Sequence, residues 1–219
     1  MGRRALPKID PALDLSARLR SLEQLPRPWD PRAVFGRVAP LEVEVGSGKG
    51  LFLRTAAARH PQLDFLGLEI SFKYARLAAA GLAKLGLENA VVACGDAVRA
   101  FAEVLPGDAL EAVHVYFPDP WWKKRHRKRR VLQESLLGHI QRTLRPGGLL
   151  HFWTDVEEYF QATLDLLAAT TRLAGPIRVE EIPAEHDMDY RTHFERRMRL
   201  HDLPVYRAVF RKPADAARP

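Results

Sequence analysis

Residues 41–71 read LEVEVGSGKGLFLRTAAARHPQLDFLGLEIS, and this stretch decides the fold. Residues 41–45 form a short, partly β-branched run that ends at a turn rich in glycine, which is typical of a buried strand. The spacing then predicts a helix over residues 51–59 and a second strand over residues 64–70. A strand, a helix and a strand in close succession predict a βαβ unit, in which the two strands run parallel.

The same alternation continues along the chain. Ser71 is expected to cap a long helix that ends before Gly86. Further strands are predicted at residues 90–94, 112–117, 149–154, 177–182 and 204–210, and further helices at residues 131–144 and 156–170. We therefore expect an α/β fold with a Rossmann-like, doubly wound, mostly parallel sheet that carries helices on both faces.

The first 40 residues differ from the rest. They contain six prolines and only patchy apolar periodicity, so we expect an irregular N-terminal arm with a short helix near residues 13–22. Residues 41–211 are predicted to form one Rossmann-like domain, because 219 residues with 47% hydrophobic content can bury one proper core. Residues 212–219 are expected to form a flexible tail.

Composition argues against several classes of protein. The chain has no run of about 20 apolar residues, the length that a membrane span requires. Its first residues carry charges but no apolar core of a signal peptide, so a cytoplasmic location is expected. The single cysteine, Cys94, lies in the apolar run AVVAC and cannot form an internal disulfide. The eight histidines show no ligand spacing, so no metal site is expected.

Acidic residues stand at or just after the predicted ends of the first five strands. Ligands of parallel α/β sheets bind beyond the carboxyl ends of the strands, so these acids would line one edge. Helix capping is the alternative for any one of them, but it is a poor explanation for the whole set. The five residues are Glu44, Glu69, Asp96, Asp119 and Asp155.

The first loop, EVGSGKG at residues 44–50, indicates which ligand the edge takes. Gly46 and Gly48 permit a tight turn and close approach of a ligand to the backbone. The loop is not a Walker A motif, and Leu51 replaces the third glycine of the dinucleotide pattern. The carboxylate of Glu44 would repel a pyrophosphate and attract an ammonium or sulfonium group, and S-adenosylmethionine carries both cations.

Two further acids fit the remainder of that cofactor. Glu69 follows Glu44 by 25 residues, where an acid can accept hydrogen bonds from both ribose hydroxyls. Asp96 could accept a hydrogen bond from the adenine amine, with a turn-forming role as the alternative. Amine, ribose and adenine would then be contacted in order along one ligand.

The run YFPDPWWKKRHRKRR at residues 116–130 concentrates the positive charge of the chain. Residues 123–130, here called the basic segment, hold seven Lys or Arg and no acid; the whole chain has 34 − 27 = +7, so the remainder is balanced. Such a cluster beside aromatic residues favours binding of nucleic acid, with a solvated loop or a localisation signal as the alternative. The residues expected to contact RNA are Lys124, Arg125, His126, Arg127, Lys128, Arg129 and Arg130.

Asp119 lies between two prolines at a strand end. Pro118 and Pro120 stiffen the backbone, so the carboxylate is presented with little entropy left to lose. It could accept hydrogen bonds from the N1–H and N2–H edge of a guanine. Trp121 or Trp122 could stack on the base, although anchoring of the loop is the more common role of such a ring.

Taken together, these motifs resemble the bacterial tRNA (guanine-N7)-methyltransferases, which belong to the S-adenosylmethionine-dependent, Rossmann-like class. The resemblance covers residues 41–207 and rests on EVGSGKG at 44–50, GLEIS at 67–71, GDA at 95–97, the 117–130 run, TD at 154–155 and THFE at 192–195. It implies cofactor contacts at Glu44, Glu69, Asp96 and Asp119, with Asp119 also catalytic. It implies tRNA contacts at Lys123, Asp155, Thr192, His193, Phe194 and Glu195. Trp122 and Asp202 depart from the pattern, which has Pro or His and glycine at these positions.

The implied reaction is methyl transfer to N7 of a guanosine in tRNA, and the resemblance implies the variable loop. Guanine N7 has a lone pair and no proton to lose, so Asp119 would orient the base and stabilise the cationic product. Two other classes are the alternatives: a nucleotide-linked dehydrogenase, which would not bind S-adenosylmethionine, and a non-catalytic RNA-binding protein, which gains nothing from acids facing phosphates. The sequence does not decide between a monomer and a homodimer.

Overall fold

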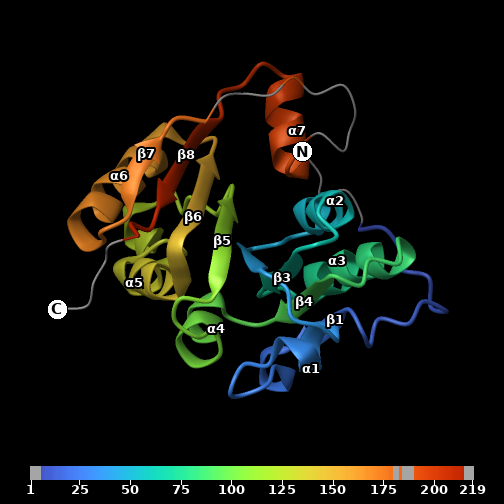
Figure 1. The fold of residues 1–219 in the computed structure, drawn as a ribbon. Helices are drawn as coiled ribbons and strands as arrows, with labels where there is room; N and C mark the ends of the chain where they lie inside the picture. The colour runs from blue at the N-terminus through green and yellow to red at the C-terminus, as the bar shows by residue number, and fades with distance from the viewer. Residues whose placement is uncertain (1–5, 180–182, 184–189, 215–219) are drawn as a thin grey trace.

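A computed structural model of the chain describes residues 6–179, 183 and 190–214 (Figure 1). Within these residues one eight-stranded sheet has the order β1-β4-β3-β2-β5-β6-β8-β7. The strands are β1 (Leu19–Ser21), β2 (Leu41–Val45), β3 (Asp64–Glu69), β4 (Ala90–Cys94), β5 (Leu110–Tyr116), β6 (Leu144–Thr154), β7 (Ala174–Ile177) and β8 (Tyr206–Arg211). Strands β1 to β6 run parallel, whereas β8 runs antiparallel to β6 and β7 antiparallel to β8, so the predicted mostly parallel sheet is confirmed.

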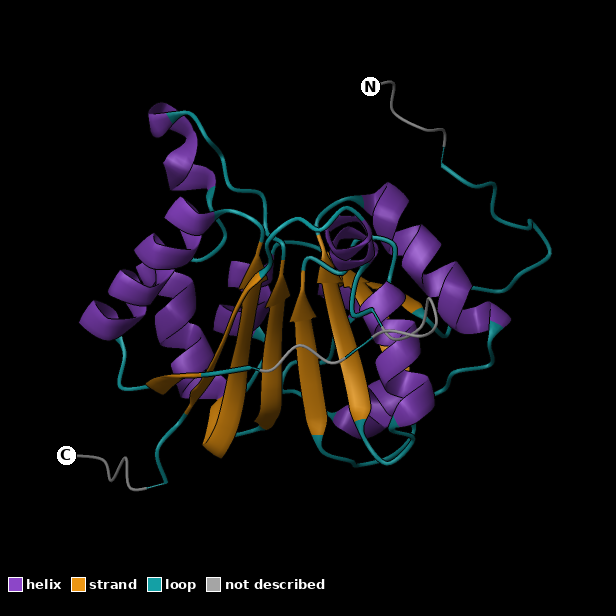
Figure 2. Ribbon diagram, turned by 90° about the horizontal axis from the view of Figure 1, so that it is seen from above, coloured by secondary structure: helices purple, strands orange, loops and turns teal. Residues whose placement is uncertain are grey.

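Helices flank the sheet on both faces (Figure 2). The helices are α1 (Pro31–Phe35), α2 (Leu51–Arg59), α3 (Phe72–Lys84), α4 (Ala97–Glu103), α5 (Glu134–Thr143), α6 (Glu157–Thr170) and α7 (His193–Leu200), with 3-10 turns η1 (Leu22–Gln24) and η2 (Lys124–Arg129). One apolar core lies between the sheet and α4, α5 and α6, and a smaller one lies between the sheet and α2 and α3. Of the described helices, none is long and apolar enough to cross a membrane.

Alternation along the strands assigns side chains to these two faces. Val43 and Val45 of β2 belong to the core under α4 and α5, so Glu42 and Glu44 point to the face that carries α2. By the same rule Tyr116 of β5 and Trp153 of β6 pack in the smaller core on that face. Polar residues of β2 therefore lie beside aromatic residues of two neighbouring strands.

The N-terminal arm is not irregular throughout, which corrects the expectation for residues 1–40. Strand β1 adds to the free edge of β4, and the helix expected near residues 13–22 is absent, since Leu19 already pairs with Val92. Asp14 explains this locally, because its carboxylate accepts the backbone N–H of Ser16 and so competes with helical hydrogen bonding. Leu22, Leu25 and Val34 are buried in the larger core.

Other boundaries differ by a few residues. Helix α5 begins at Glu134 instead of residue 131, because the basic segment ends in a 3-10 turn just before it. Strand β7 lies earlier than the predicted 177–182, and residues 180–182 are outside the described chain. Helices α4 and α7 were not predicted.

The C-terminal tail was expected to begin at residue 212, but Lys212 is held against the rest of the protein. Its Nζ donates a hydrogen bond to the Asp108 carboxylate at 2.7 Å. Residues 215–219 are not described.

Candidate cofactor and nucleic-acid site

A cavity of about 600 Å³ lies at the carboxyl ends of the parallel strands. Strand order reverses between β2 and β5, and a crevice at such a switch point is where sheets of this kind bind ligands. The structure brings five predicted site residues to its walls: Gly46, Gly48, Glu69, Asp96 and Asp119. Lys128, Arg129 and Arg130 of the basic segment also line it. The cofactor acids and part of the basic segment thus share one cavity.

Glu69 closes the glycine loop over this cavity. One carboxylate oxygen accepts the backbone N–H of Gly48 at 2.8 Å, and the other accepts the N–H of Ser71 at 2.8 Å. The loop requires glycine, because Gly46 and Gly48 have φ of 79° and 54°, values that side chains rarely adopt. Glu69 therefore has a structural role in addition to the predicted contact with a ligand.

Glu44 lies beneath the loop and does not line the cavity. It is 3% exposed, and its Oε2 has no hydrogen-bond partner. Burial, with the charge of Glu69 adding to it, raises the pKa of Glu44 well above its usual value. A buried carboxyl oxygen without a partner costs free energy, and a ligand ammonium would remove that cost. The unpartnered carboxyl oxygen of Glu44 thus fits the ammonium group in the amino-acid part of S-adenosylmethionine.

Asp96 and Asp119 differ in how they are held. Asp96 caps α4, because its side chain accepts the backbone N–H of Arg99 at 3.1 Å, so the capping alternative applies to one of its oxygens. Asp119 is exposed at the cavity, between Phe117 with φ of 48° and Trp121 with φ of 46°. Two left-handed, non-glycine residues flank the Pro-Asp-Pro unit, and such strain gathers at functional sites.

Arg130 has different surroundings from the exposed cations of the basic segment. It is 8% exposed; its Nε donates to the carbonyl of Pro120 at 2.8 Å, and its guanidinium lies 4.4 Å from the ring centroid of Tyr159. This arginine holds the Asp119 loop in place. The exposed cations are Lys123, Arg125, Arg127, Lys128 and Arg129, of which Arg127 pairs with Glu158 at 2.5 Å.

The two tryptophans have different surroundings. Trp121 lines the cavity, with the guanidinium of Arg129 5.1 Å above its ring and His126 at its edge. Trp122 is 67% exposed. The ring of Trp121 is therefore packed into the cavity wall, as expected of a residue that anchors the loop. The ring of Trp122 is exposed to solvent instead.

The THFE segment reaches the Asp119 loop through an aromatic contact. The rings of Phe194 and Phe117 lie 5.1 Å apart. Thr192 caps α7 through the backbone N–H of Glu195. Glu195 is buried, and its Oε1 lies 3.4 Å from both Arg199 and Arg207, so its carboxylate is engaged within the protein.

The remaining predicted substrate residues are scattered. His193 and Lys123 are exposed, and Asp155 is half-buried just after β6. None of the three lines the cavity, so a larger ligand would be needed to reach them from it. Asp202 has φ of 50°, which explains why a glycine would suit that turn and how an aspartate, which tolerates this conformation, replaces it.

Sequence reasoning missed several residues of the cavity. Ile70, Tyr74 and Tyr116 line it; Ile70 is 74% exposed and Tyr74 39%. Gln133 also lines it, and its side chain donates to the carbonyls of Lys128 and Arg130, which fixes the basic segment. Ile70 could have been inferred from its place directly after a strand-end acid. In the described part of the chain, no group of three His, Cys, Asp or Glu is placed to hold a metal ion.

Comparison with known proteins finds a matching family and similar bacterial proteins. A family model described as "Putative methyltransferase" matches residues 38–208. A tRNA (guanine-N(7)-)-methyltransferase of Rhodopirellula baltica is 49% identical over 218 residues, which is 97% of this chain and 80% of that protein. One of Cupriavidus necator is 40% identical over 191 residues, 86% of this chain and 72% of that protein.

Solved structures show the same fold at low sequence identity. An S-adenosylmethionine-dependent O-methyltransferase from Thermotoga maritima superposes with a TM-score of 0.53 at 16% identity, over 83% of this chain and 62% of that chain. A further S-adenosylmethionine-dependent methyltransferase, from Aquifex aeolicus, gives 0.53 at 14% identity, over 84% and 89%.

The fold, the strand-end cavity and the family match define a methyltransferase of the Rossmann-like class. Similar sequences identify the family within that class, because one tRNA (guanine-N(7)-)-methyltransferase is 49% identical to this chain over 97% of its length. The chain belongs to the family of the bacterial tRNA (guanine-N7)-methyltransferases.

Proposed function

We propose that this chain transfers a methyl group from S-adenosylmethionine to N7 of a guanosine in the variable loop of tRNA. The observation that carries the proposal is one cavity that joins cofactor acids to a rigid aspartate and a basic segment. The names of the relatives support the reaction, and the resemblance to their family supports the variable loop. A cytoplasmic location fits a tRNA substrate.

The cofactor would be held by its polar groups. Glu44 would pair with the ammonium, Glu69 would accept the ribose hydroxyls, and Asp96 would accept the adenine amine with the oxygen that does not cap α4. When bound, this cofactor supplies an electrophilic methyl group on a sulfonium. Glu44 would also discriminate between cofactors, because a buried carboxylate facing the loop would repel the pyrophosphate of a dinucleotide. This argues against a dehydrogenase.

Asp119 would orient the guanine. N7 attacks with a lone pair and loses no proton, so the required contribution is alignment and stabilisation of positive charge that develops on the ring. The Asp119 carboxylate supplies both by accepting N1–H and N2–H. Arg130 and the two prolines keep the loop from moving, which lowers the entropy cost of that alignment.

The exposed cations of the basic segment would bind tRNA phosphates. They extend from the cavity wall at Arg129 outward to Lys123, so the substrate would dock beside the opening that leads to Asp119. An exposed nucleotide is the more accessible target, because N7 faces the deep major groove of RNA helices. A non-catalytic RNA-binding protein would have no use for buried acids at the same edge.

One experiment tests the reaction. The protein is incubated with methyl-labelled S-adenosylmethionine and bulk tRNA that lacks the modification, and the nucleosides are separated. Label in N7-methylguanosine is expected, and label on another atom would refute the assignment. The position is tested with a matched pair of tRNA transcripts in which the variable-loop guanosine is kept or replaced by adenosine. Equal labelling of the two would place the target elsewhere.

A further inference from the structure

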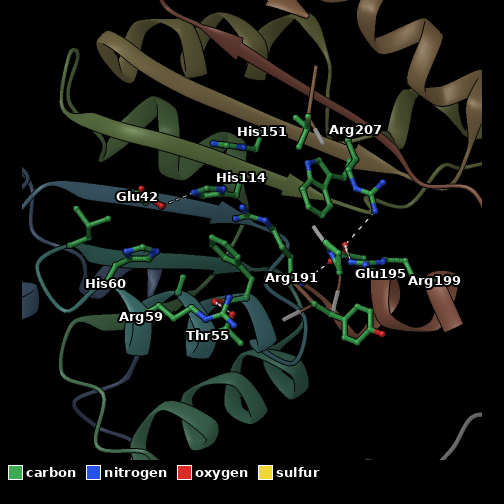
Figure 3. Close-up of a pocket in the computed structure, with 17 residues that line it drawn as sticks. Glu42, Thr55, Arg59, His60, His114, His151, Arg191, Glu195, Arg199 and Arg207 are labelled. Carbon is green, nitrogen blue, oxygen red and sulfur yellow. Dashed lines mark hydrogen bonds and ion pairs between the residues drawn. The ribbon is translucent and has the colours of Figure 1, made fainter. Parts of the chain in front are cut away.

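A second cavity, of about 380 Å³, lies on the sheet face that carries α2. Figure 3 shows side chains from α2, from β2, β5 and β6, and from residues 190–207 around it. Tyr116 lines the first cavity, while its hydroxyl lies 2.8 Å from Nδ1 of His114, which lines the second. The Tyr116 side chain thus stands between two separate spaces. The volume suits a small ligand.

Aromatic rings form one wall of this second cavity. His114 stacks on His151 with ring centroids 4.7 Å apart, and Phe52 lies 4.4 Å from His114. Burial lowers the pKa of His114 against the opposing effect of Glu42, and burial lowers the pKa of His151 well below its usual value. Both imidazoles are therefore neutral at neutral pH and offer a flat, uncharged surface.

Among the described residues that line the cavity, positive side chains outnumber negative ones. Four guanidiniums, those of Arg59, Arg191, Arg199 and Arg207, stand against two carboxylates, those of Glu42 and Glu195, a difference of 4 − 2 = +2 within this described lining. Both carboxylates already have partners, because Glu42 bonds His114 at 2.8 Å and Glu195 bonds Arg199 and Arg207. An anionic group is the ligand that this balance favours.

An indole N–H indicates where the anion would lie. Nε1 of Trp153 is buried and has no hydrogen-bond partner. The guanidinium carbons of Arg191 and Arg207 lie 5.3 and 4.9 Å from the Trp153 ring centroid. A buried donor without an acceptor is costly, and this one stands beside two cations. A ligand oxygen with negative charge would satisfy the donor and be attracted by both arginines.

A chain of hydrogen bonds holds Arg191 in this place. Its Nη1 donates to the Tyr116 hydroxyl at 3.4 Å, and that hydroxyl donates to Nδ1 of His114. Nε2 of His114 donates to Glu42, whose pKa is lowered: burial opposes ionisation, but the bond from His114 and nearby cations outweigh it. All three bonds run in one direction and end on a carboxylate, which polarises them in the same sense.

We propose that the second cavity binds a phosphate-bearing nucleoside, with its phosphate at Trp153, Arg191 and Arg207 and its base against His114 and His151. These five residues are distinct from those that the family resemblance assigns to cofactor or tRNA, although Glu195, which the resemblance assigns to tRNA, also lines the cavity and bonds Arg207. The inference rests on the proposed function only in that tRNA is one source of such a unit. The other source is a free nucleotide, which presents the same phosphate and base.

The test is calorimetric titration of guanosine 5′-monophosphate into protein saturated with S-adenosylhomocysteine, so that the first cavity is occupied. Guanosine and inorganic phosphate, titrated separately, should each bind at least about tenfold more weakly than the monophosphate. Trp153→Phe keeps an aromatic ring and removes the donor; Arg191→Gln removes the charge. Each should weaken binding about tenfold, while Arg211→Gln, at an exposed position of β8, should not.

Absence of nucleotide binding to the unmodified protein would refute the proposal, as would unchanged affinity in both cavity variants when thermal unfolding shows them folded. Competition then identifies the source. If saturating tRNA displaces the monophosphate and Arg191→Gln raises KM for tRNA, the ligand is a unit of bound tRNA; if both bind together, it is a free nucleotide. Formation of N7-methylguanosine by the unmodified protein is a separate measurement, so failure of the proposed function would be distinguishable.

Discussion

Single residues decide the chemistry, and Asp119 is the first to test. Asp119→Ala should lower kcat about 10²–10³-fold, the range for loss of one electrostatic contact made in the transition state, with tRNA affinity largely kept. The reason is that its carboxylate is exposed at the cavity in a loop that other residues hold. Single-turnover methylation measures the effect. Asp165→Ala, at an exposed position of α6, is the matched control, and near-normal turnover of Asp119→Ala would remove Asp119 from catalysis.

Glu44 predicts how cofactor affinity depends on pH. In the free protein its pKa is raised well above 4.5 by burial, with the charge of Glu69 adding to it, and a bound ammonium would favour the ionised form and lower it. Binding therefore releases a proton, so affinity should rise with pH through the window between the lower pKa of the complex and the raised pKa of the free protein.

Calorimetry with S-adenosylhomocysteine, which keeps the ammonium, measures this dependence across pH values above 4.5. Glu44→Gln preserves the shape of the side chain but cannot titrate, so its affinity should be lower at high pH and flat across the window. A rise with pH that persists in Glu44→Gln would assign the proton to another group.

At the scale of the element, the basic segment is expected to act through charge. Replacing Arg125 and Lys128 together by Ala should weaken tRNA binding and flatten the plot of log affinity against log salt by about one to two units, because each phosphate contact releases counterions. Both side chains are exposed. Salt titrations compare this variant with Arg32→Ala plus Lys84→Ala, which removes the same charge from α1 and α3. Equal slopes for the two would mean that the segment faces solvent.

Arg130 should behave differently from its neighbours. Arg130→Gln loses its contacts with Pro120 and Tyr159, so the Asp119 loop should become less ordered. We expect kcat to fall by about tenfold, comparable to the loss of one hydrogen bond from a charged donor, while the salt slope stays within error of the unmodified protein. A flattened slope with normal kcat would instead make Arg130 a phosphate contact.

At the scale of the whole molecule, the N-terminal segment belongs to the fold. Leu22 is 1% exposed and packs in the larger core, so Leu22→Ala should lower the free energy of unfolding by about 2–5 kcal/mol. Urea denaturation measures this. Val38→Ala, at an exposed position, should stay within about 0.5 kcal/mol. A Leu22 effect as small as that of Val38 would show that residues 1–40 are an appendage.

The sequence by itself determined the α/β alternation, the central parallel strands and the acids at their ends. These are local properties: apolar runs of strand length, glycines at turns, and acids at positions that parallel strands must bring to one edge. The cavity lining confirms this for Glu69, Asp96 and Asp119. Helix α7 could not be predicted in this way, because half of its residues, HFERRMRL, are charged and only Glu195 and Met198 are buried.

Only the tertiary structure decided which polar groups meet across the chain. Strand β1 forms because β4 offers a free edge, a partner 73 residues away in the pairing of Leu19 with Val92. Arg130 looks like its neighbours in sequence, yet it is buried and its side chain donates to the carbonyl of Pro120 in the Asp119 loop. Of the two adjacent tryptophans, Trp122 is the one that is largely exposed. The second cavity joins Glu42, His114 and Arg191, whose proximity no periodicity encodes. Burial and long-range pairing depend on the whole packed molecule, and they set the role of each residue there.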